Sequence, residues 1–294
     1  MLDTISLSLQ GADIPTEVRN KAQYSFEIFG IMLYPQYSRR GHLKSYAGEY
    51  RGLYVSQSIR GLYITNSWHN YYSNENYGRY TYSNITDTFH ELNEKFKGNL
   101  NAATIHRIDI GININGNYSN INDWGRMKAK SPTPMHSQGS VYGTAYRHQE
   151  YSFKAYDKSV QYQRQYGVQA PKNILRIEKT IAKSKLLKRI SANAIITARD
   201  LTNKDNLIIL RDDFLKTYNQ IKMEGNINYC NLSLREMRIV TTMQDVKARE
   251  VLKKAHFNTY RKDMKIYNDI LKREKSKDNN LYKMKQEFEA VLSA

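Results

Sequence analysis

The sequence has a single cysteine, Cys230, among its 294 residues. One cysteine excludes an internal disulfide and a zinc site built from several thiolates. The chain also lacks a run of about 18 apolar residues, which excludes a conventional membrane-spanning helix. Its first residues, Met1-Leu2-Asp3-Thr4, show no basic segment followed by an apolar one, so no secretory signal is predicted. These absences predict a cytoplasmic protein that does not contact a membrane.

Acidic residues are scarce relative to basic ones, with 28 Asp and Glu against 45 Lys and Arg, which leaves a net charge of +17. Residues 125–190 hold 14 of the basic residues and only three acids. Because like charges repel unless a partner neutralises them, this patch predicts a polyanionic partner such as nucleic acid. A basic surface that serves only solubility is the alternative. The 24 tyrosines are able to stack on unpaired bases, although tyrosine also suits the face of a sheet.

Hydrophobic periodicity divides the sequence into two parts. Residues 1–182 alternate apolar and polar side chains at many places, as strands do, whereas residues 183–294 follow a helical period almost throughout. The pattern predicts an α+β protein, with an antiparallel-sheet domain and helices on one face over 1–182, and an all-helical region over 183–294. Strands are predicted at 2–9, 50–56, 59–66, 105–115, 139–147, 150–157 and 173–182.

The helical period begins and ends at recognisable signals. Ser83 or Asn84 is expected to cap the first helix and Gly98 to end it. The stretches 66–82 and 116–138 are rich in polar or loop-forming residues and are predicted to be loops, the second of them mobile. Helices are predicted at 85–96, 158–166, 207–221, 245–256, 258–275 and 279–292, with another opened by the capping box Ser233–Glu236.

The last part of the chain, 231–294, carries 15 Lys and Arg against 9 Asp and Glu. Helices with a basic outer face grip duplex DNA in helix-turn-helix proteins. A solvated bundle that covers a sheet has the same pattern. The sequence leaves both interpretations open.

Three of the predicted strands, those at 105–115, 150–157 and 173–182, have polar residues in phase with one another. Period two places their apolar residues on one face, toward a core, and their polar residues on the other. If the strands are neighbours, the polar face gathers two carboxylates, two arginines, two lysines and a tyrosine. These residues are Arg107, Asp109, Lys154, Tyr156, Lys158, Arg176 and Glu178.

The acids and arginines of this set suit phosphodiester chemistry. Two carboxylates, here Asp109 and Glu178, are able to hold a hard divalent cation, Mg²⁺ or Mn²⁺, that polarises a phosphate. Arg107 and Arg176 have the forked donors that bind phosphate oxygens of DNA in pairs. Ordinary cross-strand ion pairs, each worth under about 1 kcal/mol, have the same residue pattern.

The tyrosine of the set is a candidate nucleophile. A phenol has a pKa near 10 and attacks poorly unless a nearby cation favours its ionised form. Lys154 and Lys158 stand two residues to either side of Tyr156 and supply positive charge. Lys154 is also a candidate contact for DNA phosphates.

Taken in order, these motifs resemble those of the filamentous-phage gene II replication proteins and related rolling-circle initiators of phages and plasmids. The family opens with a short alternating strand like residues 2–9, and the likeness extends over about 1–182. Each motif alone is nonspecific, and the ordered set is moderately specific. The motifs are Ile105-His106-Arg107-Ile108-Asp109, Phe153-Lys154-Ala155-Tyr156-Asp157-Lys158 and Leu175-Arg176-Ile177-Glu178.

The resemblance implies a nicking-endonuclease-like sheet in which Tyr156 is the nucleophile and Lys158 its companion. It also implies that Asp109 and Glu178 serve a divalent metal. The partners it implies are origin DNA, as duplex and as single strand, and the host helicase and polymerase. Most nicking enzymes of this wider class hold their metal with two histidines two residues apart, and no two of the seven histidines here are so spaced. His69 and His106 are therefore candidates for a third ligand.

Other tyrosines and other functions compete with this interpretation. Tyr162 and Tyr166 fall on the following helix, where a relaxase keeps a second nucleophile, and Tyr151 is expected to face the core with Phe153. The rival functions are a nucleic-acid-binding protein without catalysis and a mobilisation relaxase. The missing histidine pair argues against a relaxase, and alternating strands argue against the helical active site of a tyrosine recombinase.

Overall fold

The computed structural model describes residues 1–9, 24–121, 124–128, 130–170, 172–223, 227, 229–275 and 279–294. In these ranges eleven strands form one antiparallel sheet, in the order β2-β3-β4-β5-β6-β1-β7-β12-β11-β10-β9. A separate ladder pairs β13 with β8. The strands are β1 (Leu2–Leu9), β2 (Phe26–Ile28), β3 (Ile31–Tyr37), β4 (Leu43–Tyr50), β5 (Leu53–Ser58), β6 (Gly61–Ser67), β7 (Thr104–Asn115), β8 (Trp124–Met127), β9 (Thr133–Ser137), β10 (Ser140–Arg147), β11 (Tyr151–Asp157), β12 (Ile174–Ile181) and β13 (Ile221–Met223).

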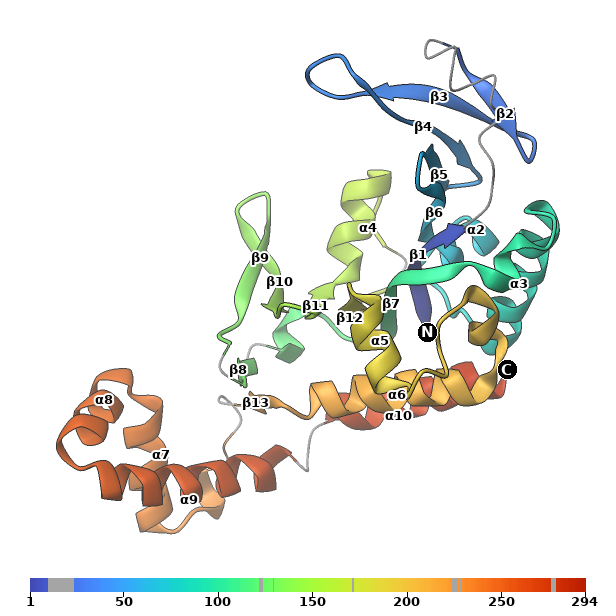
Figure 1. Cartoon of the computed structure of the whole chain (residues 1–294). Helices are drawn as coiled ribbons and strands as arrows, with labels where there is room; N and C mark the ends of the chain where they lie inside the picture. Colours follow the sequence, from blue (N-terminus) through green and yellow to red (C-terminus); the bar gives the residue numbers. More distant parts are fainter. Residues whose placement is uncertain are drawn as a thin grey trace.

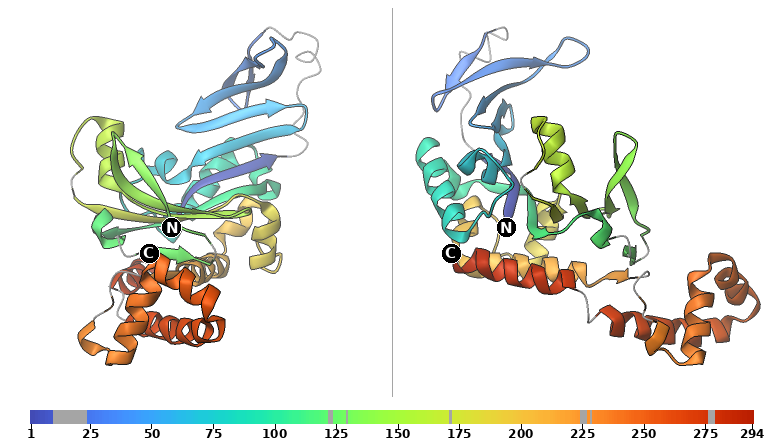
Figure 2. Two further views of the ribbon diagram at one scale, coloured as in Figure 1. Left: turned by 90° about the vertical axis from the view of Figure 1, so that its left-hand side faces the viewer. Right: turned by 180° about the vertical axis from the view of Figure 1, so that it is seen from behind.

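The sheet is curved, and its two sides differ (Figures 1 and 2). Helices α3, α6 and α10 lie on the convex side, and α4 lies on the concave side. The predicted α+β class with a large antiparallel sheet is confirmed. The helices are α2 (Trp68–Ser73), α3 (Tyr82–Lys95), α4 (Lys158–Tyr166), α5 (Ser184–Ile190), α6 (Lys204–Tyr218), α7 (Leu234–Gln244), α8 (Val246–Ala255), α9 (Phe257–Lys275) and α10 (Asn279–Ser293).

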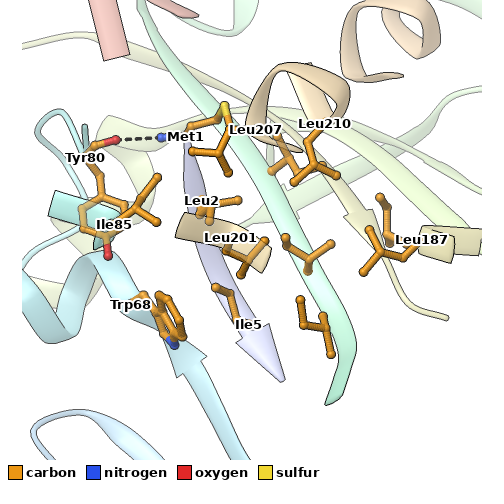
Figure 3. Packing of buried hydrophobic residues seen from close by; sticks show 14 of the residues in the cluster. Met1, Leu2, Ile5, Trp68, Tyr80, Ile85, Leu187, Leu201, Leu207 and Leu210 are labelled. Carbon is orange, nitrogen blue, oxygen red and sulfur yellow. Dashed lines mark hydrogen bonds between the residues drawn. The ribbon is translucent and has the colours of Figure 1, made fainter. Parts of the chain in front are cut away.

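The apolar residues of the central strands pack under the convex-side helices. Leu2 and Ile5 of β1 lie in one buried cluster with Leu207 and Leu210 of α6 (Figure 3). The alternating isoleucines of β7 belong to the same cluster, which confirms the predicted face of that strand. Because one face of β7, β12 and β11 is fixed against this core, their other side chains must point to the concave side.

Helices α7, α8 and α9 have a second, smaller core of their own, which includes Val240, Met243 and Ile270. They lie beyond β13 and apart from the sheet (Figures 1 and 2). Helices α5, α6 and α10 instead contribute to the main cluster. The domain boundary predicted at residue 182 stays a prediction. Within the described part of the chain, no helix has the length and apolar character needed to cross a bilayer.

Two predicted loops are partly wrong. Stretch 66–82 contains α2, and its aromatic residues Trp68, Tyr71 and Tyr80 are buried, so aromatic content outweighs the polar composition. Stretch 116–138 contains the strands β8 and β9, and Trp124 of β8 is buried.

Several predicted boundaries also shift. The strand predicted at 50–56 begins only at Leu53, because Arg51 and Gly52 form a turn at positive φ of 47° and 80°. Thr81 rather than Ser83 or Asn84 caps α3, with Asn84 completing the capping box. The helix predicted at 207–221 ends at Tyr218, and β13 follows it, so the last part of the chain is not wholly helical.

Candidate active site

Strands β7, β12 and β11 are neighbours, and they bring the predicted polar residues together on the concave side. The register pairs Lys154 with Glu178, and Tyr156 with Arg176. On the other side of β12, Gly111 lies opposite Glu178, and Asp109 lies two residues further along β7. The two carboxylates, Asp109 and Glu178, and the phenol of Tyr156 therefore lie on one face of three neighbouring strands.

Ion pairs connect the members of this cluster. Arg107 holds Asp109 in a forked contact, with Nε at 3.0 Å and Nη2 at 2.7 Å from the two carboxylate oxygens. Glu178 accepts from Lys154 at 2.7 Å and from Arg176 at 3.0 Å. Asp109 and Glu178 are each 2 % exposed, so both carboxylates are taken out of water by the fold.

The Tyr156 phenol is 5 % exposed and donates to Oε2 of Glu178 at 3.4 Å. The Tyr156 side chain is therefore more buried than the solvent-facing position predicted from the sequence. Burial, assisted by the negative charge of Glu178, raises the pKa of Tyr156 well above 10. The phenol is neutral at physiological pH and needs a proton acceptor if it is to attack.

Gly143 makes room for this ring. It lies opposite Tyr156 across the β10–β11 ladder, and a Cβ built on it would stand 2.5 Å from the Cβ of Tyr156. Any side chain at position 143 would push the phenol away from Glu178. The ring of Tyr142 packs edge-on against Tyr156 at 6.2 Å.

Lys158, at the start of α4, is 2 % exposed and donates to the Gln161 side chain at 2.9 Å. Burial, followed by the positive charge of Arg176, lowers the pKa of Lys158 from 10.5 to about 8. At a pKa of about 8, roughly a tenth of this amine is uncharged at pH 7, and the uncharged amine is able to accept a proton.

Arg176 lies at the centre of the cluster and is 3 % exposed. Its guanidinium donates to Asp3, Glu178 and Asn113 at 2.6, 3.0 and 3.0 Å. Gly111 allows this placement, because a Cβ there would lie 2.6 Å from Nη2 of Arg176. All three acceptors belong to the protein, and the prediction that Arg176 contacts a DNA phosphate stays a prediction. Arg107 and Lys154 keep 43 % and 28 % of their side chains exposed.

Asp3 is a member of the cluster that sequence reasoning missed. A bulge lies in β1 between Leu2 and Ile5, both of which face the core, and it turns Asp3 toward Arg176 on the concave side. Bulges often re-aim a side chain next to a functional site. The available signal was a charged residue in phase with buried Ile5 and Leu7, where a regular strand would bury it in the core.

A solved rolling-circle replication initiator protein from Geobacillus stearothermophilus resembles the chain with a TM-score of 0.40. The alignment covers 83% of this chain and 96% of that one, at 12% sequence identity. No family model matches the sequence, and no curated protein matches it.

The arrangement of the acids does not fit a resident divalent cation. In the described ranges no group of three His, Cys, Asp or Glu side chains converges as metal ligands do. Asp109 and Glu178 are neutralised by Arg107, Lys154 and Arg176, whereas Mg²⁺ requires free carboxylate oxygens. The prediction of Mg²⁺ or Mn²⁺ at these two acids therefore stays a prediction without a donor set to support it.

The histidines predicted as a third ligand have other partners. His69 is 4 % exposed and stacks on Tyr80 at 5.0 Å. Burial, together with nearby positive charges, lowers the pKa of His69 to about 3. His106 shares a hydrogen bond of 2.6 Å with the Ser8 hydroxyl.

We expect Mn²⁺ to leave the stability of the DNA-free protein unchanged, because a bound cation would have to break existing ion pairs. A cation bound at 100 times its Kd would add about 2.7 kcal/mol to the free energy of unfolding, which is a shift of several degrees in Tm. Thermal unfolding with and without millimolar Mn²⁺ measures this. A rise of several degrees that Asp109→Asn removes would show that the acids do bind a cation without DNA.

Two of the other candidate tyrosines, Tyr162 and Tyr151, contact groups other than the two carboxylates. The Tyr162 ring, on α4, contacts the Tyr77 ring at 5.0 Å. The Tyr166 side chain lies outside the described residues. Tyr151 packs against the main core on the same side as Phe153, as predicted, with Nζ of Lys179 over its ring at 4.9 Å.

The basic stretch 125–190 is less exposed than its composition indicates. Three of its 14 cations, Lys158, Arg176 and Lys179, are buried. Lys179 forms an ion pair with Asp213 of α6 on the convex side. Part of the positive charge predicted to face a polyanion thus stabilises the protein interior.

Proposed function

We propose that the chain is a replication initiator that nicks one DNA strand through Tyr156 and starts rolling-circle replication. The observation that supports this best is the position of the Tyr156 phenol. It lies on the polar side of the sheet, in hydrogen-bond reach of Glu178 and close to the cations Lys154 and Arg176. A phenol, a proton acceptor and positive charge in one buried cluster are what attack on a phosphodiester requires.

In the proposed step, the Tyr156 oxygen attacks the phosphorus of the scissile phosphodiester. The new bond makes a 5′-phosphotyrosine, and the bond to the 3′-oxygen breaks to leave a free 3′-hydroxyl. Lys158, with its pKa near 8, takes the phenol proton, and the leaving 3′-oxygen takes a proton from water. Lys154 and the half-exposed Arg107 neutralise charge on the phosphate oxygens. No step is assigned to a metal.

The 3′-hydroxyl would then be extended by a host polymerase behind a host helicase, and a second transfer would close the circle. Helices α7, α8 and α9 are the candidate binding surface for duplex origin DNA. Lys247, Lys253 and Lys254 of α8 are exposed beside Val251, which is 64% exposed. A basic helix with a small apolar contact suits a major groove.

We expect nicking of supercoiled DNA from the encoding replicon to increase as pH rises through about 8. Below this pH, Lys158 is protonated and unable to accept the phenol proton, and above it the amine is free. Conversion of supercoiled circles to open circles, followed by gel from pH 6 to 10, measures the rate. Lys158→Met should lower the rate and remove the inflection.

The rival function without catalysis predicts a different gel. A binding protein without catalysis would shift the DNA and leave it supercoiled at every pH. An inflection that persists in Lys158→Met would assign the proton acceptor to another group.

A further inference from the structure

Three tyrosines form a row on the concave side of the sheet, between the candidate active site and the far edge. We call Tyr63 of β6, Tyr54 of β5 and Tyr34 of β3 the tyrosine track. Tyr34 is 56% exposed and Tyr54 is 45% exposed, so both rings are open to a partner. Nothing in the main core requires them, because their strands bury the alternate residues Leu33, Val55 and others.

The strand register places the track on the same face as the candidate active site. Next to Asp109, Arg107 of β7 pairs with Ser6 of β1, and Ser6 pairs with Thr65 of β6. The hydroxyls of Ser6 and Thr65 are 2.6 Å apart, which confirms that they share a face. Thr65 in turn pairs with Tyr54.

The same face continues to the outer strands. Tyr54 pairs with Glu49 of β4, and Ala47, two residues from Glu49, pairs with Tyr34. Tyr63 lies beside His106, with ring centres 6.3 Å apart. The strand order puts seven spacings between β11 and β3, and at about 4.8 Å each these two strands lie roughly 34 Å apart across the sheet.

The charge along this surface is mixed, with the positive side chains near its two ends. Arg107 stands at the inner end, and Arg39, Arg40 and Lys44 are exposed around the β3–β4 turn at the outer end. Glu49 is an exposed acid between them. Rings that lie between basic groups bind single strands well, because bases stack on the rings while phosphates contact the cations.

We propose that the tyrosine track binds single-stranded DNA that leads to Tyr156, with bases stacked on Tyr63, Tyr54 and Tyr34. This deepens the proposed function, on which its direction toward Tyr156 rests. Duplex DNA does not fit the track, because its bases are already stacked on each other and do not present free faces. The partner is therefore unpaired DNA of any sequence.

The test compares binding of a fluorescent oligothymidylate of about 16 nucleotides by the full-length chain and its variants. Tyr34→Ala with Tyr54→Ala should weaken binding about tenfold for each ring removed. Tyr34→Phe with Tyr54→Phe keeps the rings and should bind as the unaltered chain does, and it also controls for folding. Tyr282→Ala removes a 63% exposed tyrosine on α10, which lies on the convex side, and it should leave the affinity for the oligothymidylate unchanged.

The outcomes separate this inference from the proposed function, when covalent adducts at Tyr156 are assayed in parallel. Equal binding by the alanine double variant and by Tyr282→Ala overturns the track, even if Tyr156 forms adducts. Weakened binding without any adduct at Tyr156 supports the track and overturns the nicking proposal. An equal loss of affinity for a duplex of the same length also overturns the track, since stacking requires unpaired bases.

Discussion

Tyr156→Phe should reduce formation of a covalent protein–DNA adduct by about 10³-fold or more, because it removes the only oxygen of that side chain. The variant should fold normally. The phenol makes one long hydrogen bond, 3.4 Å to Glu178, while its ring packs as phenylalanine would. Denaturing gels of a single-stranded origin oligonucleotide labelled on the 3′ side of the nick measure the adduct.

Tyr162→Phe is the matched control. Tyr162 lies on α4, and its ring contacts the ring of Tyr77. The Tyr162→Phe variant should therefore form the adduct at the rate of the unaltered chain. Oligonucleotide binding should be nearly the same in both variants. An adduct that survives in Tyr156→Phe and disappears in Tyr162→Phe would move the nucleophile to the helix.

Asp3→Asn should lower the free energy of unfolding by about 3–5 kcal/mol, the usual cost of leaving one partner of a buried ion pair. Arg176 is 3 % exposed, and it would keep Glu178 but lose the carboxylate that lies 2.6 Å from Nη2. Asp3 also accepts from the Ser67 hydroxyl at 2.5 Å. Urea unfolding at pH 7 measures the change.

The effect should depend on pH in a defined direction. Although burial opposes it, the charge of Arg176 holds the pKa of Asp3 below its ordinary value of 3.8. A depressed pKa contributes stability above the ordinary value, and this contribution is lost as pH falls through the folded-state pKa. The difference between Asp3→Asn and the unaltered chain should therefore be full at pH 7 and shrink below about pH 4.

Asp109→Asn is the comparison that isolates the role of Arg176. Burial and the charge of Glu178 raise the pKa of Asp109, so its charged form is already disfavoured by the fold. Its partner Arg107 is 43% exposed and is able to regain water. We expect a loss of less than about 2 kcal/mol. A larger loss for Asp109→Asn than for Asp3→Asn would contradict the assignment of Arg176 as the centre of the buried network.

Strand periodicity predicted the polar face of the candidate site well. In β7, β11 and β12 the apolar residues are buried, so a shift of register would expose a whole row of isoleucines. This constraint is local and visible in the sequence. It is why Asp109, Tyr156 and Glu178 were expected on one face, which is where they lie.

What the sequence did not reveal depends on contacts between distant segments. Asp3 joins Arg176 across 173 positions of the chain, and only the bulge in β1 turns it to the concave side. The burial of Arg176 requires Gly111 opposite Glu178, which no periodicity predicts. The buried aromatic residues of α2 were likewise hidden in a stretch of polar composition.

The most direct test of the central claim is to map the residue that becomes joined to DNA. The protein is incubated with supercoiled replicon DNA, the DNA is digested, and peptides that carry a nucleotide are identified by mass spectrometry. We predict that the nucleotide is linked through its 5′-phosphate to Tyr156. A nucleotide on any other residue, or nicked DNA with no linked peptide, would contradict the account.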